Sequence, residues 1–349
     1  MSKKGILLLN LGSPEALTVP AVREYLNEFL MDGRVIDVPY LPRRLLVSLI
    51  LLRRPAVKVE EYSSVWTDEG SPLIVTSRKV QDALQERFEF PVELAMNYAK
   101  PTIAGALERL QNAGVTDLFI MPLYPHYAMS SYETVVVKTM SQIREKGDPF
   151  KTTLLKPFYA DPDYIDALHE VSRPDLESGF DHLLFTFHGV PERHLRKSDP
   201  SHEHCMTTPD CCATCHPAHA TCYRHQCLRT AGEFVKKANI PEDKYSVAFQ
   251  SRLGRDPWLE PYTDKTLESY GKKGFGKLLI ISPSFVADCL ETLEEIGIGG
   301  AEAYKDAGGG DYKLIPCLNE HPTWISFLEN RIHSWIEGPE IPSIGRLAS

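Results

Sequence analysis

One histidine stands where a site built on a β-sheet would hold it. His188 follows the apolar run 183–187 and opens the stretch HGVPERH. If that run is a buried strand, the imidazole lies at the C-terminal end of the strand, the edge at which parallel sheets bind ligands. Near neutral pH an imidazole serves as a metal ligand or as a general base. The alternative is a histidine that packs in a loop or faces solvent.

Three carboxylates follow a second apolar run. After residues 278–281 the sequence reads SPSFVADCLETLEEI, in which Asp288, Glu291 and Glu295 are spaced i, i+3 and i+7. On an α-helix this spacing places them on one face, where they repel each other unless the face meets solvent, a metal or another cation. With His188 at an adjacent strand end, they predict a site for a divalent first-row metal such as Fe²⁺, or groups that move protons. A solvated helix face is the alternative.

A third group of reactive residues lies in the segment 202–227. Six of the eight cysteines are there, together with five histidines. The cysteines are Cys205, Cys211, Cys212, Cys215, Cys222 and Cys227. In a cytoplasmic chain such clustering favours a metal centre over disulfides. Four thiolates suit an iron–sulfur cluster, whereas the same thiolates with histidines also suit a tetrahedral Zn²⁺.

The rest of the sequence predicts the elements that position these groups. With 349 residues and 43% hydrophobic content, the chain is long enough for two domains with sizeable cores. Short apolar runs alternate with amphipathic stretches, a pattern typical of βαβ units around mainly parallel sheets. Helices are expected after Thr18 and after Pro101, and from Pro322 onward. Strands are expected at residues 6–9, 92–96, 118–121, 183–187, 245–249, 278–281 and 313–316.

A weak internal repeat predicts two similar halves. The stretches GVTDLFIMP at 114–122 and GFGKLLIIS at 274–282 each lead to a Glu-Thr pair, at Glu133 and Glu291. We therefore expect an α/β fold of two similar Rossmann-like domains with mainly parallel sheets and a ligand cleft between them. The first domain is placed at 1–158 with a C-terminal helix at 319–338, and the second, which carries the metal-site residues and the insertion 202–227, at 159–318.

Composition disfavours several classes of protein. The net charge of -9 lacks the basic excess that phosphate neutralisation requires, so a nucleic-acid partner is not expected. No GxGxxG or GxxxxGK[ST] loop is present, which weakens the case for a nucleotide cofactor. The N-terminal MSKKGILLLNLG is too short in its apolar part for a signal peptide, so we expect a cytoplasmic protein.

The most membrane-like run is LLVSLILL at residues 45–52. It is far shorter than the roughly 20 residues that a membrane-spanning helix needs. Arginines flank it on both sides, as in a short segment that lies at a lipid interface. They are Arg43, Arg44, Arg53 and Arg54. The alternative is a buried helix with polar ends.

Six ordered blocks give the chain a recognisable pattern. They are LLLNLGSPEALTVPAVREYLNEFLMDGRVIDVP, DEGSPL, PLYPHY, FTFHGVPERH, FQSRLGRDPWLEPYTD and SPSFVADCLETLEEI. Over nearly its whole length the sequence resembles the ferrochelatase family. The resemblance implies that His188 is the metal-site histidine that takes pyrrole protons and that Glu291 is its carboxylate partner. It also implies that Asp288 and Glu295 continue an acidic path for protons or metal. Residues that line or border the porphyrin pocket would be Tyr62, Ser71, Tyr98 and Tyr124.

The sequence departs from the family pattern at several positions. Cys289 stands where many relatives have histidine, and Asn97 precedes Tyr98 where arginine is common. Met129 replaces a cluster cysteine of animal-type relatives, and no CxxC lies near the C-terminus, so a cluster of the animal type is not expected.

By the same resemblance, the insertion is expected to hold a [2Fe-2S] cluster, with Zn²⁺ as the rival metal. The expected ligands are Cys205, Cys222 and Cys227, with Cys211 or Cys212 as the fourth. Cys215 is the weaker candidate.

The resemblance implies the last step of heme synthesis, insertion of Fe²⁺ into protoporphyrin IX. One alternative is a chelatase for another tetrapyrrole such as coproporphyrin or sirohydrochlorin. Others are a non-catalytic heme or metal carrier and a redox protein that works through its cluster. The expected partners are protoporphyrin IX and Fe²⁺, with peripheral membrane contact left open. The sequence gives no indication of the oligomeric state.

Overall fold

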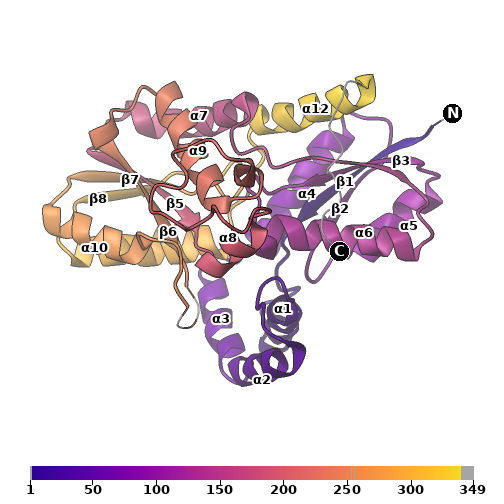
Figure 1. Ribbon diagram of the computed structural model, residues 1–349, viewed down its shortest axis with the longest axis horizontal. Coiled ribbons are helices and arrows are strands. Elements are labelled where there is room, and N and C mark those ends of the chain that lie inside the picture. The colour runs from indigo at the N-terminus through magenta and orange to yellow at the C-terminus, as the bar shows by residue number, and fades with distance from the viewer. Residues whose placement is uncertain (1, 253, 255, 339–349) are drawn as a thin grey trace. The chain divides into compact units, whose positions relative to one another are not determined.

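The computed structural model describes residues 2–252, 254 and 256–338 (Figure 1). Contacts divide the chain into two compact units. The first is formed within Met1–Leu123, Ser130–Lys156 and Trp324–Ser349, and the second within Tyr124–Met129 and Pro157–Thr323. The loop Tyr124–Met129 thus packs with the second unit, although it lies within the range 1–158 that the sequence assigns to the first domain.

The first unit is a parallel sheet of order β2-β1-β3-β4 with its helices. Residues 6–9 of β1 are fully buried because the strand is central and its sheet is covered on both faces. The strands are β1 (Lys4–Asn10), β2 (Val92–Met96), β3 (Asp117–Pro122) and β4 (Lys151–Leu154). The helices are α1 (Val19–Met31), α2 (Tyr40–Ile50), α3 (Arg54–Ser63), α4 (Pro72–Gln85), α5 (Ile103–Asn112), the π-helix η1 (Met129–Glu133), α6 (Thr134–Glu145) and α12 (Pro322–Glu337).

The second unit repeats this plan with the order β6-β5-β7-β8, again all parallel. The strands are β5 (His182–His188), β6 (Tyr245–Gln250), β7 (Lys277–Ile281) and β8 (Asp311–Leu314). The helices are α7 (Pro162–Glu177), α8 (Glu192–Ser198), η2 (Pro217–Ala220), α9 (Tyr223–Lys237), η3 (Glu242–Lys244), α10 (Thr263–Lys273), the π-helix η4 (Glu291–Gly299) and α11 (Gly300–Asp306). The predicted α/β class with two Rossmann-like sheets is confirmed.

Sequence patterns locate the inner strands well and the edge strands poorly. Strand β4 (KTTL) has no apolar run, because its side chains are exposed or half-exposed at the edge of the sheet. Strand β8, also at an edge, begins two residues before the predicted run 313–316. The predicted helix starts are confirmed: Thr18 caps α1 by accepting the Ala21 N–H, and α12 begins at Pro322. Among the described residues, no helix is both long and apolar enough to cross a membrane.

Candidate active site

The second sheet places the segments of His188 and Glu291 after two neighbouring strands, β5 and β7. The chain leaves these two strands toward opposite edges of the sheet, which makes the place between them the switch point of the sheet. Strand β5 pairs with β6 on one side and with β7 on the other. Doubly wound sheets bind ligands just beyond this point, at the C-terminal ends of the strands. His188 is the last residue of β5, and the loop after β7 leads to Glu291. The predicted location of His188 at a strand end is confirmed.

The imidazole of His188 is held in one orientation by its own chain. Its Nδ1 lies 2.7 Å from the Gly189 carbonyl oxygen. Because a carbonyl only accepts, Nδ1 carries a proton, and in the neutral imidazole the lone pair is therefore on Nε2. The Phe285 ring stands edge-on to the imidazole at 6.5 Å between centroids. This side chain is half-buried, and Nε2 of its neutral form suits a base or a metal ligand.

Gly189 makes this strand end possible. Its N–H donates to the Gln250 carbonyl at 2.6 Å. A Cβ added at Gly189 would lie 2.9 Å from the carbonyl oxygens of both Gln250 and Ser251. Since backbone cannot yield as a flexible side chain does, any larger residue would push β5 away from β6. The close approach explains the glycine after the histidine.

Glu291 opens the π-helix η4, a helix type that is rare and often marks functional sites. Its carboxylate is half-buried and faces the Cys289 thiol, which lies within hydrogen-bonding reach. Burial, and then the charge of Glu291, raise the pKa of Cys289 well above its usual value, so the thiol stays protonated and donates. Glu295 follows about one turn later and accepts a hydrogen bond from the Ser251 hydroxyl at 3.0 Å.

The prediction that Asp288 shares a helical face with Glu291 and Glu295 is wrong. Helix η4 begins at Glu291, and Asp288 lies in the loop before it. Its carboxylate is already occupied: it accepts from the Asn319 side chain at 2.7 Å, from the Thr292 hydroxyl at 3.2 Å and from the Cys317 N–H at 3.3 Å. Asp288 therefore ties the loop before the π-helix to the segment after β8.

A cavity of about 250 Å³ lies beside η4 within the second unit. Glu295 and Ser251 line it, together with Arg252 and Gln250 at the end of β6. Gln250 is buried, and its Nε2 has no hydrogen-bond partner among the described residues. Sequence reasoning did not single out Gln250, Ser251 or Arg252, although they stand in the block FQSRLGRDPWLEPYTD.

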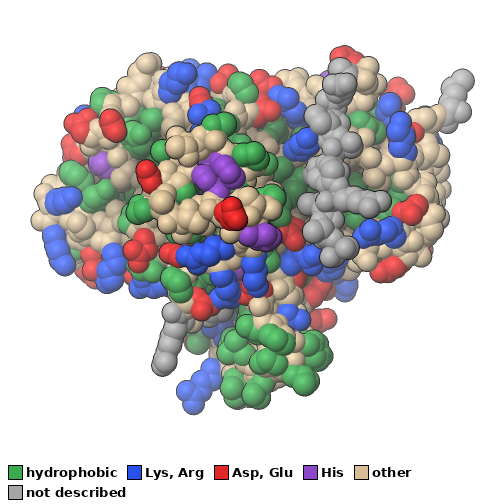
Figure 2. Space-filling model, viewed as in Figure 1, with side chains coloured by type: hydrophobic (Ala, Val, Ile, Leu, Met, Phe, Trp, Pro, Cys, Tyr) green, Lys and Arg blue, Asp and Glu red, His purple; other side chains and the backbone are tan. Residues whose placement is uncertain are grey.

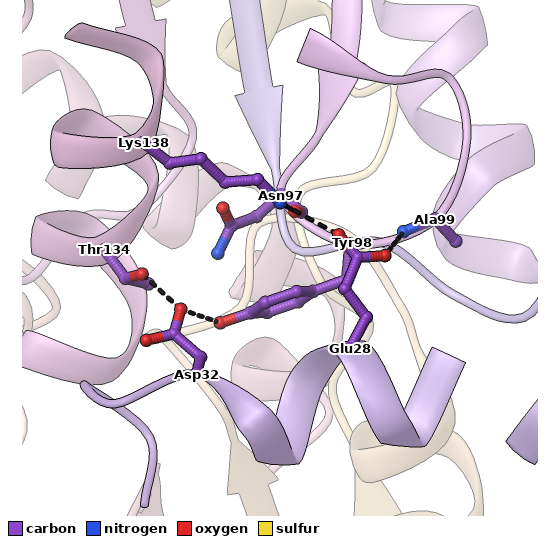
Figure 3. A network of polar contacts seen from close by, with 7 residues as sticks. All are labelled: Glu28, Asp32, Asn97, Tyr98, Ala99, Thr134 and Lys138. Carbon is purple, nitrogen blue, oxygen red and sulfur yellow. Dashed lines mark hydrogen bonds and ion pairs between the residues drawn. The ribbon is translucent and has the colours of Figure 1, made fainter. Parts of the chain in front are cut away.

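Three of the predicted porphyrin-pocket residues belong to the first unit. Tyr62 is buried edge-on against Trp66, and Ser71 is the buried N-cap residue of α4. The Tyr98 hydroxyl donates to Asp32 at 2.8 Å, and Thr134 donates to the same carboxylate (Figure 3).

Tyr124 belongs to the second unit, and its environment differs. Its hydroxyl is buried with no hydrogen-bond partner among the described residues. Burial raises its pKa far above the usual value for tyrosine, so the hydroxyl is protonated and able to donate.

The cysteine-rich insertion gathers several thiols. The Cys222 thiol is within hydrogen-bonding reach of the thiols of Cys205 and Cys212, and Cys212 is also in reach of Cys211. Cys215 is exposed, and the Cys227 thiol is buried inside α9 against Tyr223. Among the described residues, no three His, Cys, Asp or Glu side chains already have their ligand atoms in an arrangement that would hold one metal ion.

The thiols of Cys205 and Cys212 are neutral in this arrangement. The neighbouring Cys222 thiol and burial raise the pKa of Cys212, and burial raises the pKa of Cys205 to about 11. A metal centre would have to displace these protons when it binds.

Asp199 anchors the start of the insertion. Its buried carboxylate accepts the N–H groups of Ser201, His204 and Cys205 at 2.8–2.9 Å. Although burial opposes ionisation, these hydrogen bonds and that of the Ser201 hydroxyl hold the pKa of Asp199 well below its usual range. A single anionic side chain thus fixes the backbone that presents Cys205.

Comparisons with known proteins identify the family of the chain. The sequence model of the ferrochelatase family matches residues 3–335. A ferrochelatase of Stutzerimonas stutzeri is 50% identical over 94% of this chain and 97% of its own. One of Opitutus terrae is 48% identical over 97% and 99%.

Solved structures show the same fold at low identity. SirB from Bacillus subtilis with Fe³⁺ has a TM-score of 0.55 at 12% identity and covers 95% of both chains. The sirohydrochlorin chelatase SirB from Bacillus subtilis subspecies spizizenii, in complex with cobalt, has a TM-score of 0.54 at 11% identity and covers 97% of both. These structures show the fold alone. The family model and the sequence relatives show that the chain belongs to the ferrochelatase family.

Proposed function

We propose that this enzyme inserts Fe²⁺ into protoporphyrin IX and that His188 and Glu291 carry the reaction. The observation that supports this most directly is the pairing at the switch point of the second sheet. An imidazole with a free Nε2 ends β5, and a carboxylate opens the π-helix after the neighbouring strand β7. Family membership supplies the class of reaction.

The two residues answer the two demands of the chemistry. The macrocycle must lose both inner N–H protons, and the hydrated Fe²⁺ must lose water as it enters the ring. Nε2 of His188 is oriented as a proton acceptor by the Nδ1 hydrogen bond to Gly189. The carboxylate of Glu291 is a hard oxygen ligand that can replace water on Fe²⁺ and can also take up a proton.

The remaining site residues take supporting roles in this proposal. Glu295, which faces the 250 Å³ cavity with Ser251, continues the acidic path for metal or protons behind Glu291. Asp288 supports that path indirectly. Its carboxylate accepts hydrogen bonds that hold the loop before η4 in place. Tyr62, Ser71, Tyr98 and Tyr124 border the porphyrin.

The test is an anaerobic insertion assay on the purified protein. Fe²⁺ is added with protoporphyrin IX or with coproporphyrin, and the loss of porphyrin fluorescence and the gain of the heme spectrum are followed. Faster turnover with protoporphyrin supports the proposal. Preference for coproporphyrin would assign another tetrapyrrole, and binding without insertion would leave a carrier.

We further propose a [2Fe-2S] cluster in the insertion. The contacts among the thiols fit this group, because Cys205, Cys212 and Cys222 meet in pairs and the anchored loop at Asp199 presents them. The sequence expects Cys205, Cys222 and Cys227 as ligands, with Cys211 or Cys212 as the fourth. Because the Cys212 thiol is in reach of Cys222 and the Cys227 thiol contacts Tyr223, Cys227 is the expected ligand to test against Cys211. When bound, the cluster would supply one-electron chemistry and would tie down a segment that has little regular structure.

Metal analysis and single serine variants test the cluster. Anaerobically purified protein should contain about two irons and two sulfides per chain and show the absorbance of a thiolate-bound cluster. Cys222→Ser should remove this absorbance, whereas Cys215→Ser, at an exposed position, should keep it. Cys211→Ser and Cys227→Ser compared side by side identify the fourth ligand. Stoichiometric zinc in place of iron would contradict the proposal.

Helix α2 is the proposed place of peripheral membrane contact for an otherwise cytoplasmic protein. Val47 is the buried residue of this helix, whereas Leu45 and Leu49 within it and Leu52 just after it are 66%, 59% and 73% exposed. Figure 2 shows this apolar surface as a continuous green patch over the helix. An exposed patch of this kind marks an interaction site, and its length permits contact without spanning.

A further inference from the structure

Arg224 stands against the cysteine sulfurs of the insertion. It is half-buried in the first turn of α9, and its Nη1 lies 3.8 Å from Sγ of Cys211 and 4.0 Å from Sγ of Cys212. These are distances at which an N–H group donates weakly to sulfur and at which a positive charge acts strongly on it. Cys212 is in turn within hydrogen-bonding reach of Cys222. The guanidinium thus touches the group of thiols directly.

The position of Arg224 calls for an anion. A cation in the first turn of a helix lies at the positive end of the helix dipole, where it is disfavoured. Helix α9 has no acidic residue in its first turn, and no carboxylate among the described residues lies within ion-pair distance of Arg224. By contrast, Arg229 on the same helix pairs with Glu233 at 2.6 Å. The sulfurs are therefore the partners that can offset the charge of Arg224, provided that they are ionised.

We propose that Arg224 compensates the charge of the cluster and raises its reduction potential. This inference rests on the proposed [2Fe-2S] cluster. Such a cluster with four thiolates is a dianion when oxidised and a trianion when reduced, so a cation at the sulfurs stabilises the reduced state more. Hydrogen bonds to cluster sulfurs act in the same direction. The step is the uptake of one electron from an external reductant, without transfer of a proton or an atom.

The experiment is an anaerobic redox titration with dithionite on the full chain, followed by absorbance and by the spin signal of the reduced cluster. Arg224→Gln removes the charge and keeps the polar end of the side chain. At a fixed potential near the wild-type midpoint, its ratio of reduced to oxidised cluster should fall about tenfold, a shift of about 59 mV for a one-electron couple. Arg224→Lys keeps the charge with a different geometry and should shift less. The matched control Arg229→Gln, on the same helix, should leave the midpoint unchanged.

The outcomes separate this inference from the cluster proposal. A wild-type protein without cluster absorbance contradicts the cluster itself, and the inference falls with it. A loaded cluster with equal midpoints in Arg224→Gln and Arg229→Gln overturns the inference alone. If Arg224→Gln fails to assemble a cluster, Arg224→Ala, which also removes the charge, is compared with wild type: a lowered midpoint supports the role of Arg224, and an unshifted one overturns it.

Discussion

The two sheets follow one plan, and the corresponding positions carry different chemistry. In each, the third strand along the chain, β3 or β7, leads through a loop into a π-helix, η1 or η4. Glu133 at the end of η1 is neutralised by Arg34 at 2.9 Å. Glu291 at the start of η4 has no basic partner among the described residues, and its described neighbour is the Cys289 thiol. The π-helix of the first unit thus carries a carboxylate that is paired with an arginine. The π-helix of the second unit carries one that can bind a metal or accept a proton.

The ends of the central strands repeat this contrast. Strand β1 ends at Asn10 and β5 ends at His188, in equivalent places of the two sheets. The amide of Asn10 is buried and both of its ends are bonded: it donates to the Ser77 hydroxyl at 3.1 Å and accepts the Leu11 N–H at 2.8 Å. Of the His188 ring nitrogens, Nδ1 alone has a hydrogen-bond partner among the described residues. Asn10 at the end of β1 thus has a structural role, whereas His188 at the end of β5 has a nitrogen that can react.

The largest expected effect comes from removing that nitrogen. His188→Ala should lower the rate of iron insertion by about 10³-fold, because the residue that accepts pyrrole protons is lost. Thermal unfolding and porphyrin binding should change little. The equivalent change Asn10→Ala should do the reverse and lower the free energy of unfolding by about 1–3 kcal/mol, since it leaves buried polar partners unsatisfied. Near-normal insertion by His188→Ala would remove it from the reaction.

The second prediction compares the two carboxylates. Glu291→Gln keeps the shape but removes the charge and the base, and should lower the insertion rate by about 10²-fold. Glu133→Gln weakens a partly exposed ion pair with Arg34, so the free energy of unfolding should fall by about 1 kcal/mol or less and the rate should hold. Both rates are measured with saturating porphyrin. Equal losses of rate in the two variants would show that the comparison of the two π-helices is mistaken.

The connections after the central strands also differ between the units. Between β1 and β2 the first unit has α1 to α4, whereas between β5 and β6 the second has α8, the cysteine-rich insertion and α9. The insertion contains little regular structure, and its start depends on hydrogen bonds to one carboxylate, Asp199. Helix packing therefore supports one connection, and charged hydrogen bonds support the start of the other.

The third prediction uses this dependence. Asp199→Asn should lower the free energy of unfolding by about 2–3 kcal/mol at neutral pH, because charged hydrogen bonds are lost and an N–H faces backbone donors. The folded pKa of Asp199 is depressed, so its contribution is full above the unfolded pKa of about 3.9 and disappears as pH falls through the lower folded value. Denaturant melts should show a constant gap to wild type from pH 5 to 8 that narrows below roughly pH 4. A gap that stays constant in acid would exclude the carboxylate as its source.

Features that depend on residues close together in the sequence can be predicted from it, whereas features that depend on distant residues cannot. Central strands and helix caps are local patterns, so β5, the cap at Thr18 and the place of His188 can be read from the sequence. The start of η4 cannot, because Asp288 is held in its loop by Asn319 and Cys317, which lie about thirty residues further along the chain. For the same reason, Asp199 and Arg224 carry no sequence signal: they matter through the residues that folding brings to them.

The smallest expected effect concerns the apolar surface of α2 and of Leu52 just after it. Among the described residues, the insertion 202–227 has no large exposed hydrophobic side chain of this kind. Leu49 and Leu52 are largely exposed, and the nearby Arg53 and Arg54 are exposed as well, so the face suits vesicles that contain anionic lipid. The double change Leu49→Ser and Leu52→Ser should lower vesicle association about tenfold, since each leucine buried at the acyl boundary contributes roughly 1 kcal/mol or more. Turnover with detergent-solubilised porphyrin should hold, because these side chains add little to folding where they are already exposed. The matched control, isoleucine at both positions, keeps the apolar area and should keep the association measured by vesicle sedimentation. If the serine variant sediments with vesicles as wild type does, α2 is not the contact surface.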